Sequence, residues 1–356
     1  MESESETMAQ LKRIAAAAMA AAMALSAAGC SGADKSWAVK DSTDTVAIGS
    51  YIYNLYSAYS TASSKVTDSS KKVLEQKIDN EDAASWIRAK ALSDTKALLL
   101  TEQKMKEMKL SLSDSEKSQA KSAASSAWSS YSSTLEKYGI AQSSFQATVD
   151  AVYKEDKIFN ALYGKGGSKA VSDGDLKDFY TKNYTSFAYL YCPLYTTDSN
   201  GNYKASLSDA DKKKAEQQFG DYASQIKAGK MTMQQAADAY KKSINSSSDQ
   251  LNSETVNLTT DTSYPDALKK ALTDMKSGEI RTLELTTQAA YLLIEKNDIE
   301  ADADTKLKTD SGRSGILRDY KWEEFNTAFE KEADAMTGVT VNENAINSYN
   351  PSMFES

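Results

Sequence analysis

The chain has no histidine among its 356 residues, and this limits the chemistry that it can perform. Histidine is the commonest general acid–base group and a member of the Ser-His-Asp and Cys-His arrangements. Those mechanisms are therefore excluded, as are metal sites with imidazole ligands. The two cysteines are Cys30 and Cys192. The N-terminal pattern described below predicts that Cys30 is lipidated, so Cys192 has no disulfide partner in the mature chain, and we expect it in a half-buried strand.

Two acidic segments contain the oxygen ligands that calcium prefers. Residues 198–202 (DSNGN) lack the distal acidic residue of a calcium loop and predict a turn. The alternating acids Asp298, Glu300, Asp302 and Asp304 define no ligand geometry, and a solvated loop is the simpler interpretation. We therefore expect no metal and no cofactor.

The N-terminal segment has the pattern of a bacterial export signal. Lys12 and Arg13 precede an apolar run, residues 14–28, which ends in small residues and Cys30. The run is shorter than the ~20 residues of a spanning helix. We expect residues 1–29 to be removed and Cys30 to be lipidated, with an ordinary cleaved signal as the alternative. The first seven residues are acidic, so Met8 is an alternative start to Met1.

Composition narrows the class of protein further. The net charge is −8, with charges of both signs interspersed, which argues against a nucleic-acid partner. The length allows about two domains after the signal. With only 3 prolines and 15 glycines, we expect long helices.

After the lipidated cysteine, residues 30–44 are small and polar and predict a flexible spacer. From 45 to 183, apolar residues recur at helical spacing, and Ser113 with Glu116 forms a capping box. This pattern predicts an all-helical lobe. Its aromatic residues are mostly core, but some are candidates for lining a peptide-binding groove: Tyr51, Tyr56, Trp128 and Phe159.

The pattern changes in residues 184–300. Strand formers dominate four segments, 187–195, 253–258, 280–285 and 290–295, with capped helices between them. The order β-α-α-β-α-β-β predicts an α+β domain with a small sheet. Residues 301–356 then carry an amphipathic helix that must dock on another element, and we expect it to return to the helical lobe.

This organisation resembles the extracytoplasmic foldases of the PrsA/SurA type. Residues 112–116 (LSDSE) and 138–140 (YGI) are similar to the family's chaperone lobe. Residues 275–280 (MKSGEI) and 290–298 (AYLLIEKND) are similar to the third helix and closing strand of its parvulin-type prolyl isomerase domain. The resemblance covers residues 45–345. It implies an α+β fold in which a helical chaperone lobe, built from N- and C-terminal segments, carries an inserted parvulin-like domain.

The departures from the family lie in the isomerase pocket. Parvulin sites use two histidines, and the matching positions here are Leu292 and either Leu190 or Tyr191. The family's Cys or Asp matches loosely to Asp249, and a pocket-lining residue falls near Leu268. No catalytic residue carries over.

The resemblance therefore implies a lipid-anchored folding factor on the outer face of a Gram-positive cell membrane. Its partners would be unfolded or nascent exported proteins, and the resemblance also allows a homodimer. Two alternatives remain. One is an active prolyl isomerase with an atypical pocket, since isomerisation needs no covalent chemistry. The other is a solute-binding lipoprotein, which the helix content disfavours.

Overall fold

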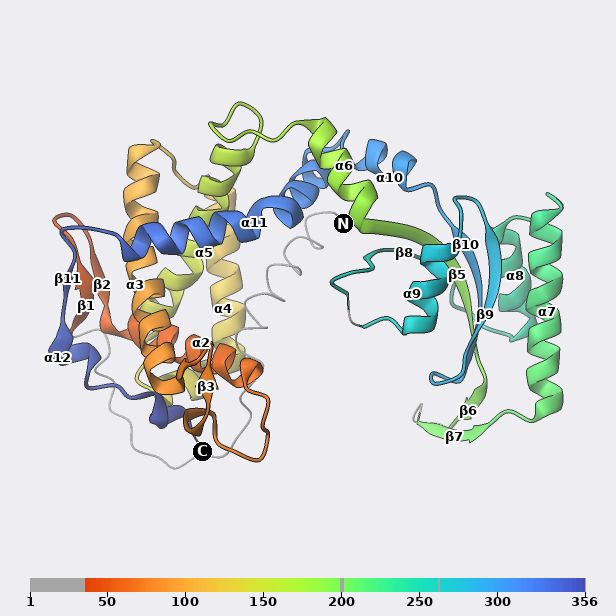
Figure 1. Ribbon diagram of the computed structural model, residues 1–356, viewed down its shortest axis with the longest axis horizontal. Helices are drawn as coiled ribbons and strands as arrows, with labels where there is room; N and C mark the ends of the chain where they lie inside the picture. The colour runs from red at the N-terminus through yellow and green to blue at the C-terminus, as the bar shows by residue number, and fades with distance from the viewer. Residues whose placement is uncertain (1–35, 199–201, 262, 356) are drawn as a thin grey trace. The chain divides into compact units, whose positions relative to one another are not determined.

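The computed structural model describes residues 36–198, 202–261 and 263–355. The chain divides into two compact units (Figure 1). Unit 1 combines the described part of Met1–Ala170 with Lys321–Ser356, and unit 2 is Val171–Tyr320. The predicted export signal, including Cys30, lies outside the described residues.

Unit 1 is mainly helical. Its N-terminal segment contains β1 (Trp37–Lys40), β2 (Thr45–Ala47), α2 (Ile48–Lys65), η2 (Val73–Glu75), β3 (Lys77–Ile78), β4 (Glu81–Asp82), α3 (Ala83–Glu107), α4 (Asp114–Lys137) and α5 (Gln142–Tyr163). Its C-terminal segment contains the end of α11 (Asp310–Asp334), then β11 (Thr340–Val341), α12 (Glu343–Ile346) and η3 (Pro351–Phe354).

The two segments of unit 1 share one core. The Phe354 ring, from η3, packs against Tyr56 of α2 and Tyr138 at the end of α4, with ring centroids 5.4 and 4.8 Å apart. In α11, Trp322 packs edge-on against Phe159 of α5 at 5.1 Å. Residues far apart in sequence therefore close the same apolar core.

A three-stranded sheet corrects two details of the sequence analysis. Strands β11, β1 and β2 pair in that order, with Val39 opposite both Val341 and Val46. Ala38 and Val39 are fully buried. Residues 37–40 of the predicted spacer 30–44 therefore form a strand, and the lobe is not all helical. Two apolar residues in a polar stretch are enough to anchor this short strand in the core.

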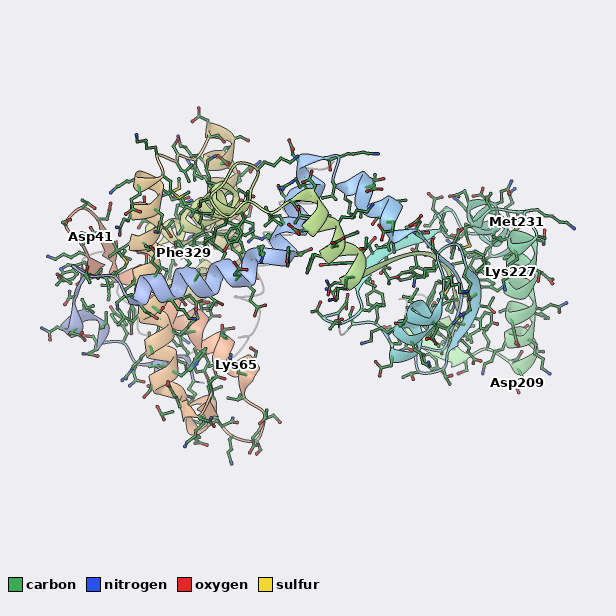
Figure 2. All side chains as sticks on the ribbon, turned by 45° about the horizontal axis from the view of Figure 1, so that its top comes forward. Asp41, Lys65, Asp209, Lys227, Met231 and Phe329 are labelled. Atoms are coloured by element: carbon green, nitrogen blue, oxygen red, sulfur yellow. The ribbon has the colours of Figure 1, made fainter. Side chains whose placement is uncertain are left out.

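Unit 2 contains α6 (Asp173–Asn183), β5 (Tyr184–Pro193), β6 (Tyr195–Thr197), β7 (Tyr203–Ser206), α7 (Asp209–Lys227), α8 (Met233–Ser243), β8 (Asn252–Asn257), α9 (Asp266–Asp274), β9 (Ile280–Leu285), β10 (Ala290–Lys296) and α10 (Ile299–Lys306). Four strands form an antiparallel sheet in the order β8-β5-β10-β9. The α+β class and the predicted element order are confirmed, with an added β6–β7 hairpin. Figure 2 marks the ends of α7 at Asp209 and Lys227.

The helix α6, which the sequence analysis assigned to the helical lobe, makes its contacts within unit 2. Arg313 is buried and donates to the Val171 carbonyl and to Asp173, both at 2.6 Å. Tyr180 of α6 donates to Asp302 at 2.6 Å. The acids 298–304 are therefore not a solvated loop: Asp298 caps α10, and Asp302 anchors α6.

The start of α4 is fixed to α5 by one carboxylate. Glu116 accepts a hydrogen bond from the Ser113 amide, completing the predicted capping box, and accepts another from Lys157 of α5 at 2.8 Å. Partial burial raises the pKa of Glu116, but the Lys157 and Ser113 hydrogen bonds outweigh it and lower the pKa to about 2. This carboxylate therefore stabilises unit 1 in its ionised form.

We predict that Glu116→Gln removes part of the pH dependence of unit 1 stability. A lowered folded pKa contributes stability that is present above the usual Glu value of about 4.3 and lost as the pH falls towards 2. The side chain is 34% exposed, and screening reduces the contribution to about 1 kcal/mol. Urea unfolding at pH 7 and pH 2.5 measures it by tryptophan fluorescence, because Trp37, Trp86, Trp128 and Trp322 all lie in unit 1.

The variant should be less stable than wild type at pH 7 and nearly equal at pH 2.5. Asp114→Asn is the matched control, since it removes a fully exposed charge from the same helical turn. Its effect should be at most about half as large. An equal deficit of Glu116→Gln at both pH values would contradict the assignment.

Candidate functional site

Strand β5 separates the two apolar layers of unit 2. Successive side chains of a strand point to opposite faces of the sheet. Leu190 and Cys192 pack in the layer with α7 and α8, whereas Phe187 and Tyr191 pack in the layer with α9. The register pairs Tyr191 directly with Leu292 of β10. Of the two alternatives left open by the sequence, Tyr191 rather than Leu190 shares a face with Leu292.

The face on the α9 side presents a group of half-buried aromatic and aliphatic side chains, which we call the tyrosine face. They pack over a fully buried layer that includes Leu268 and Leu292. Its members are Tyr189, Tyr191, Leu258, Tyr264 and Leu283. Three of the four pocket positions expected from the sequence, Tyr191, Leu268 and Leu292, are therefore brought together here.

The tyrosine hydroxyls are neutral hydrogen-bonding groups. Tyr189 donates to Glu254 of β8 at 2.7 Å. Burial, followed by this hydrogen bond, raises the pKa of Tyr189. Burial and a hydrogen bond with Tyr195 likewise raise the pKa of Tyr191. Neither phenol loses its proton near neutral pH, so the face offers apolar area and neutral hydroxyl groups rather than a general base.

Helix α9 is held on this face by Lys296 of β10. The ammonium donates to the carbonyls of Leu272 and Met275 at 2.6 and 2.8 Å, which are among the free carbonyls at the end of the helix. Burial lowers the pKa of Lys296. The helix begins after Pro265, and this places Tyr264 at the border of the face.

The fourth expected position, Asp249, does not join the site. Its side chain is 86% exposed and pairs with Lys241 of α8 at 3.1 Å. The loop before β8 carries it away from the α9 face, which corrects the loose match made from the sequence. The sequence analysis also missed Tyr189, Leu258, Tyr264 and Leu283. The alternation of side chains along 187–195 would have paired Tyr189 with Tyr191 on one face.

The helical-lobe candidates for peptide binding are mostly core residues. Tyr51, Tyr56 and Phe159 are 2%, 5% and 1% exposed, so no peptide reaches them in this structure. Trp128 is partly buried and lies 5.9 Å from the Phe145 ring. The correction has a simple cause: the periodicity that marks an apolar helix face marks a core face equally well.

Cys192 lies in the layer opposite the tyrosine face and is buried, and burial raises the pKa of its thiol. Among the described residues, no three His, Cys, Asp or Glu side chains gather closely enough to hold a metal. A helix with the length and apolarity to cross a bilayer is likewise absent from this part of the chain.

Comparison with known proteins gives a structural likeness only. No family model and no curated protein matches the chain. Solved structures that resemble it include PrsA foldases. PrsA of Streptococcus pneumoniae gives a TM-score of 0.42 at 13% identity, over 73% of this chain and 88% of that one. PrsA of Lactococcus lactis gives 0.38 at 13% over 90% and 98%, and PrsA of Bacillus subtilis gives 0.32 at 15% over 76% and 94%.

We predict that Phe159 acts as a core residue and not as a client contact. Replacing a fully buried Phe by Ala removes apolar contacts and leaves a cavity, so Phe159→Ala should destabilise unit 1 by about 3–5 kcal/mol. Urea unfolding followed by tryptophan fluorescence measures the loss. Asn160→Ala, on the exposed neighbouring position, should stay within about 0.5 kcal/mol of wild type. A Phe159→Ala protein of unchanged stability would contradict the core assignment.

Proposed function

We propose that this chain is an extracytoplasmic folding factor that binds unfolded exported polypeptides, with the tyrosine face as one binding surface. The observation that carries the proposal is the set of half-buried aromatic and aliphatic side chains on the α9 side of the sheet. This face combines apolar area with neutral hydroxyl groups. It suits a ligand defined by apolar side chains and a peptide backbone more than one defined by charge.

Tyrosine is well suited to such binding. Its ring supplies a large apolar area at a low cost in conformational entropy, and its hydroxyl hydrogen-bonds to whatever backbone group lies near it. The selectivity that results is broad, because every unfolded chain offers apolar side chains and carbonyls. A folding factor needs this breadth.

The site of action belongs to the same proposal. The basic and apolar N-terminal segment ending at Cys30 supports export and lipid anchoring at the outer face of the cell membrane. A lipid anchor would keep the protein where exported chains emerge unfolded.

A catalytically active prolyl isomerase is the second candidate. Tyr191 and Leu292 pair across β5 and β10 at the positions that match the two parvulin histidines. An apolar environment by itself favours the rotation of an amide bond, whose barrier is ~18–20 kcal/mol. However, Leu292 is only 2% exposed and offers no polar group. Binding without efficient catalysis is therefore the function that we favour.

We expect the full chain to suppress the aggregation of thermally unfolded citrate synthase, followed by light scattering. The double variant Tyr191→Ser, Leu283→Ser exchanges apolar area on the tyrosine face for hydroxyls. At least twice as much of it should be needed for the same suppression. Tyr203→Ser is the matched control, because Tyr203 lies in the same unit, is 64% exposed and is not part of the face. A wild-type protein without suppression would reject the proposed function.

The isomerase alternative is tested by protease-coupled turnover of a Xaa-Pro peptide. We expect the full chain to give the uncatalysed rate, because no acid–base or polar group occupies the Leu292 position. Catalysis in wild type that disappears in Tyr191→Ala and Leu292→Ala would replace our proposal with the enzyme.

A further inference from the structure

A pocket in unit 1 lies apart from the tyrosine face. Its volume is about 590 Å³, and its walls come from the end of α3, the connection 108–113, the first turns of α4, and α5. This size falls in the range that holds a compact organic ligand or one large side chain with its neighbours.

The floor of the pocket is apolar. Met105 and Leu112 are buried, and Leu110 is half-buried between them. The backbone reverses here: Lys109 adopts a positive φ of 52°, and the Leu110 amide donates to the Met105 carbonyl at 2.8 Å. This helix ending sets Leu110 into the wall of the pocket.

The rim of the pocket is basic, although the chain as a whole carries a net charge of −8. Lys106, Lys117, Lys121 and Lys154 line it, against two acids, Glu102 and Asp150. Lys106 and Lys154 form ion pairs with Asp44 and Glu102. Lys117 and Lys121 are therefore the lysines of the rim that can attract an anionic group.

Two of the lysines are well placed to meet a ligand. Lys117 and Lys121 are exposed and lie four residues apart on α4, so they project from neighbouring points of one helix face. Lys117 pairs with the fully exposed Asp114 at 3.3 Å, and Lys121 has no ion pair with any residue that the structure describes. Exposed pairs of this kind contribute ~0–1 kcal/mol, so a ligand carboxylate displaces them at little cost.

We propose that this pocket binds polypeptide segments in which an apolar side chain is flanked by acidic residues. The apolar side chain occupies the floor, and the carboxylates meet Lys117 and Lys121. This inference rests on the proposed function and gives unit 1 a selectivity of its own.

The type of cation favours a polypeptide over a small carboxylate. Arginine fixes a carboxylate in one bidentate geometry, whereas lysine is a flexible point charge. A rim built from lysines accepts carboxylates at varied positions. Such tolerance suits acidic segments of differing sequence and not one fixed ligand.

The test uses two fluorescein-labelled dodecapeptides in a Gly/Ser background, one with Phe flanked by two glutamates on each side and one with lysines in their place. Fluorescence anisotropy with the full chain should give a Kd about five- to tenfold lower for the glutamate peptide. The preference should shrink when NaCl is raised from 50 to 500 mM, because salt screens exposed charges. Equal affinities at low salt would overturn the proposal.

Two variants separate the contributions of the basic rim and the apolar floor of the pocket. Lys117→Glu with Lys121→Glu should reverse the preference to the lysine peptide. Leu110→Gln should weaken both peptides and keep the preference. The control is Lys77→Glu with Lys331→Glu, which makes the same charge change at exposed positions elsewhere in unit 1. If the α4 variant leaves the preference unchanged, or if the control variant reverses it equally, the preference does not come from the pocket and the proposal is overturned.

The remaining outcomes separate this proposal from the proposed function. If aggregation suppression persists without any acidic preference, the pocket proposal fails and the folding-factor function stands. If neither peptide binds and suppression is also absent, the function itself fails. Decanoate has an apolar tail and a carboxylate without a peptide backbone. Decanoate binding that is lost in the α4 variant, with no binding of either peptide, would overturn a polypeptide as the ligand.

Discussion

The burial of strand β5 on both of its faces is the constraint on which unit 2 depends. The strand pairs with β8 on one side and β10 on the other, and it separates the α7–α8 layer from the α9 layer. A slip of one residue would exchange the two faces and send Tyr191 under α7 and α8. The long pairing with β10, from Phe187 to Pro193, prevents this slip. The tyrosine face exists because that register is fixed.

The chemistry of the chain follows from what its faces contain. At the two sheet positions that the sequence analysis matched to the parvulin histidines, the structure places a half-buried tyrosine, Tyr191, opposite a buried leucine, Leu292. The phenols are protonated near neutral pH at the ordinary tyrosine pKa, and burial raises the pKa of Tyr189 and Tyr191 further. The site is thus arranged to exclude water and to hold apolar groups, while the basic pocket beside α4 adds a surface of different charge. The two proposed binding surfaces therefore differ in polarity and in charge.

Unit 1 depends on contacts between distant parts of the chain. Phe354 and Trp322 complete a core that begins with α2 and α5, and β11 pairs with β1. Such non-local closure ties the stability of the unit to residues near the C-terminus. It also explains why aromatic residues that resemble a groove in sequence are buried in the structure, since later elements of the chain cover them.

The sequence by itself determined the class of the fold and the order of the main elements of unit 2. Local signals were sufficient for this: the capping box at Ser113, the strand formers in 290–295 and the helical spacing from residue 45 are properties of neighbouring residues. The absence of histidine also excluded whole classes of mechanism at once. Tertiary structure alone decided which residues share a face and which faces are covered. It placed Tyr191 opposite Leu292, paired Asp249 with Lys241, and buried Tyr51 and Phe159. Periodicity identifies an apolar face but not what covers it, because covering depends on strand register and on packing partners distant in the chain.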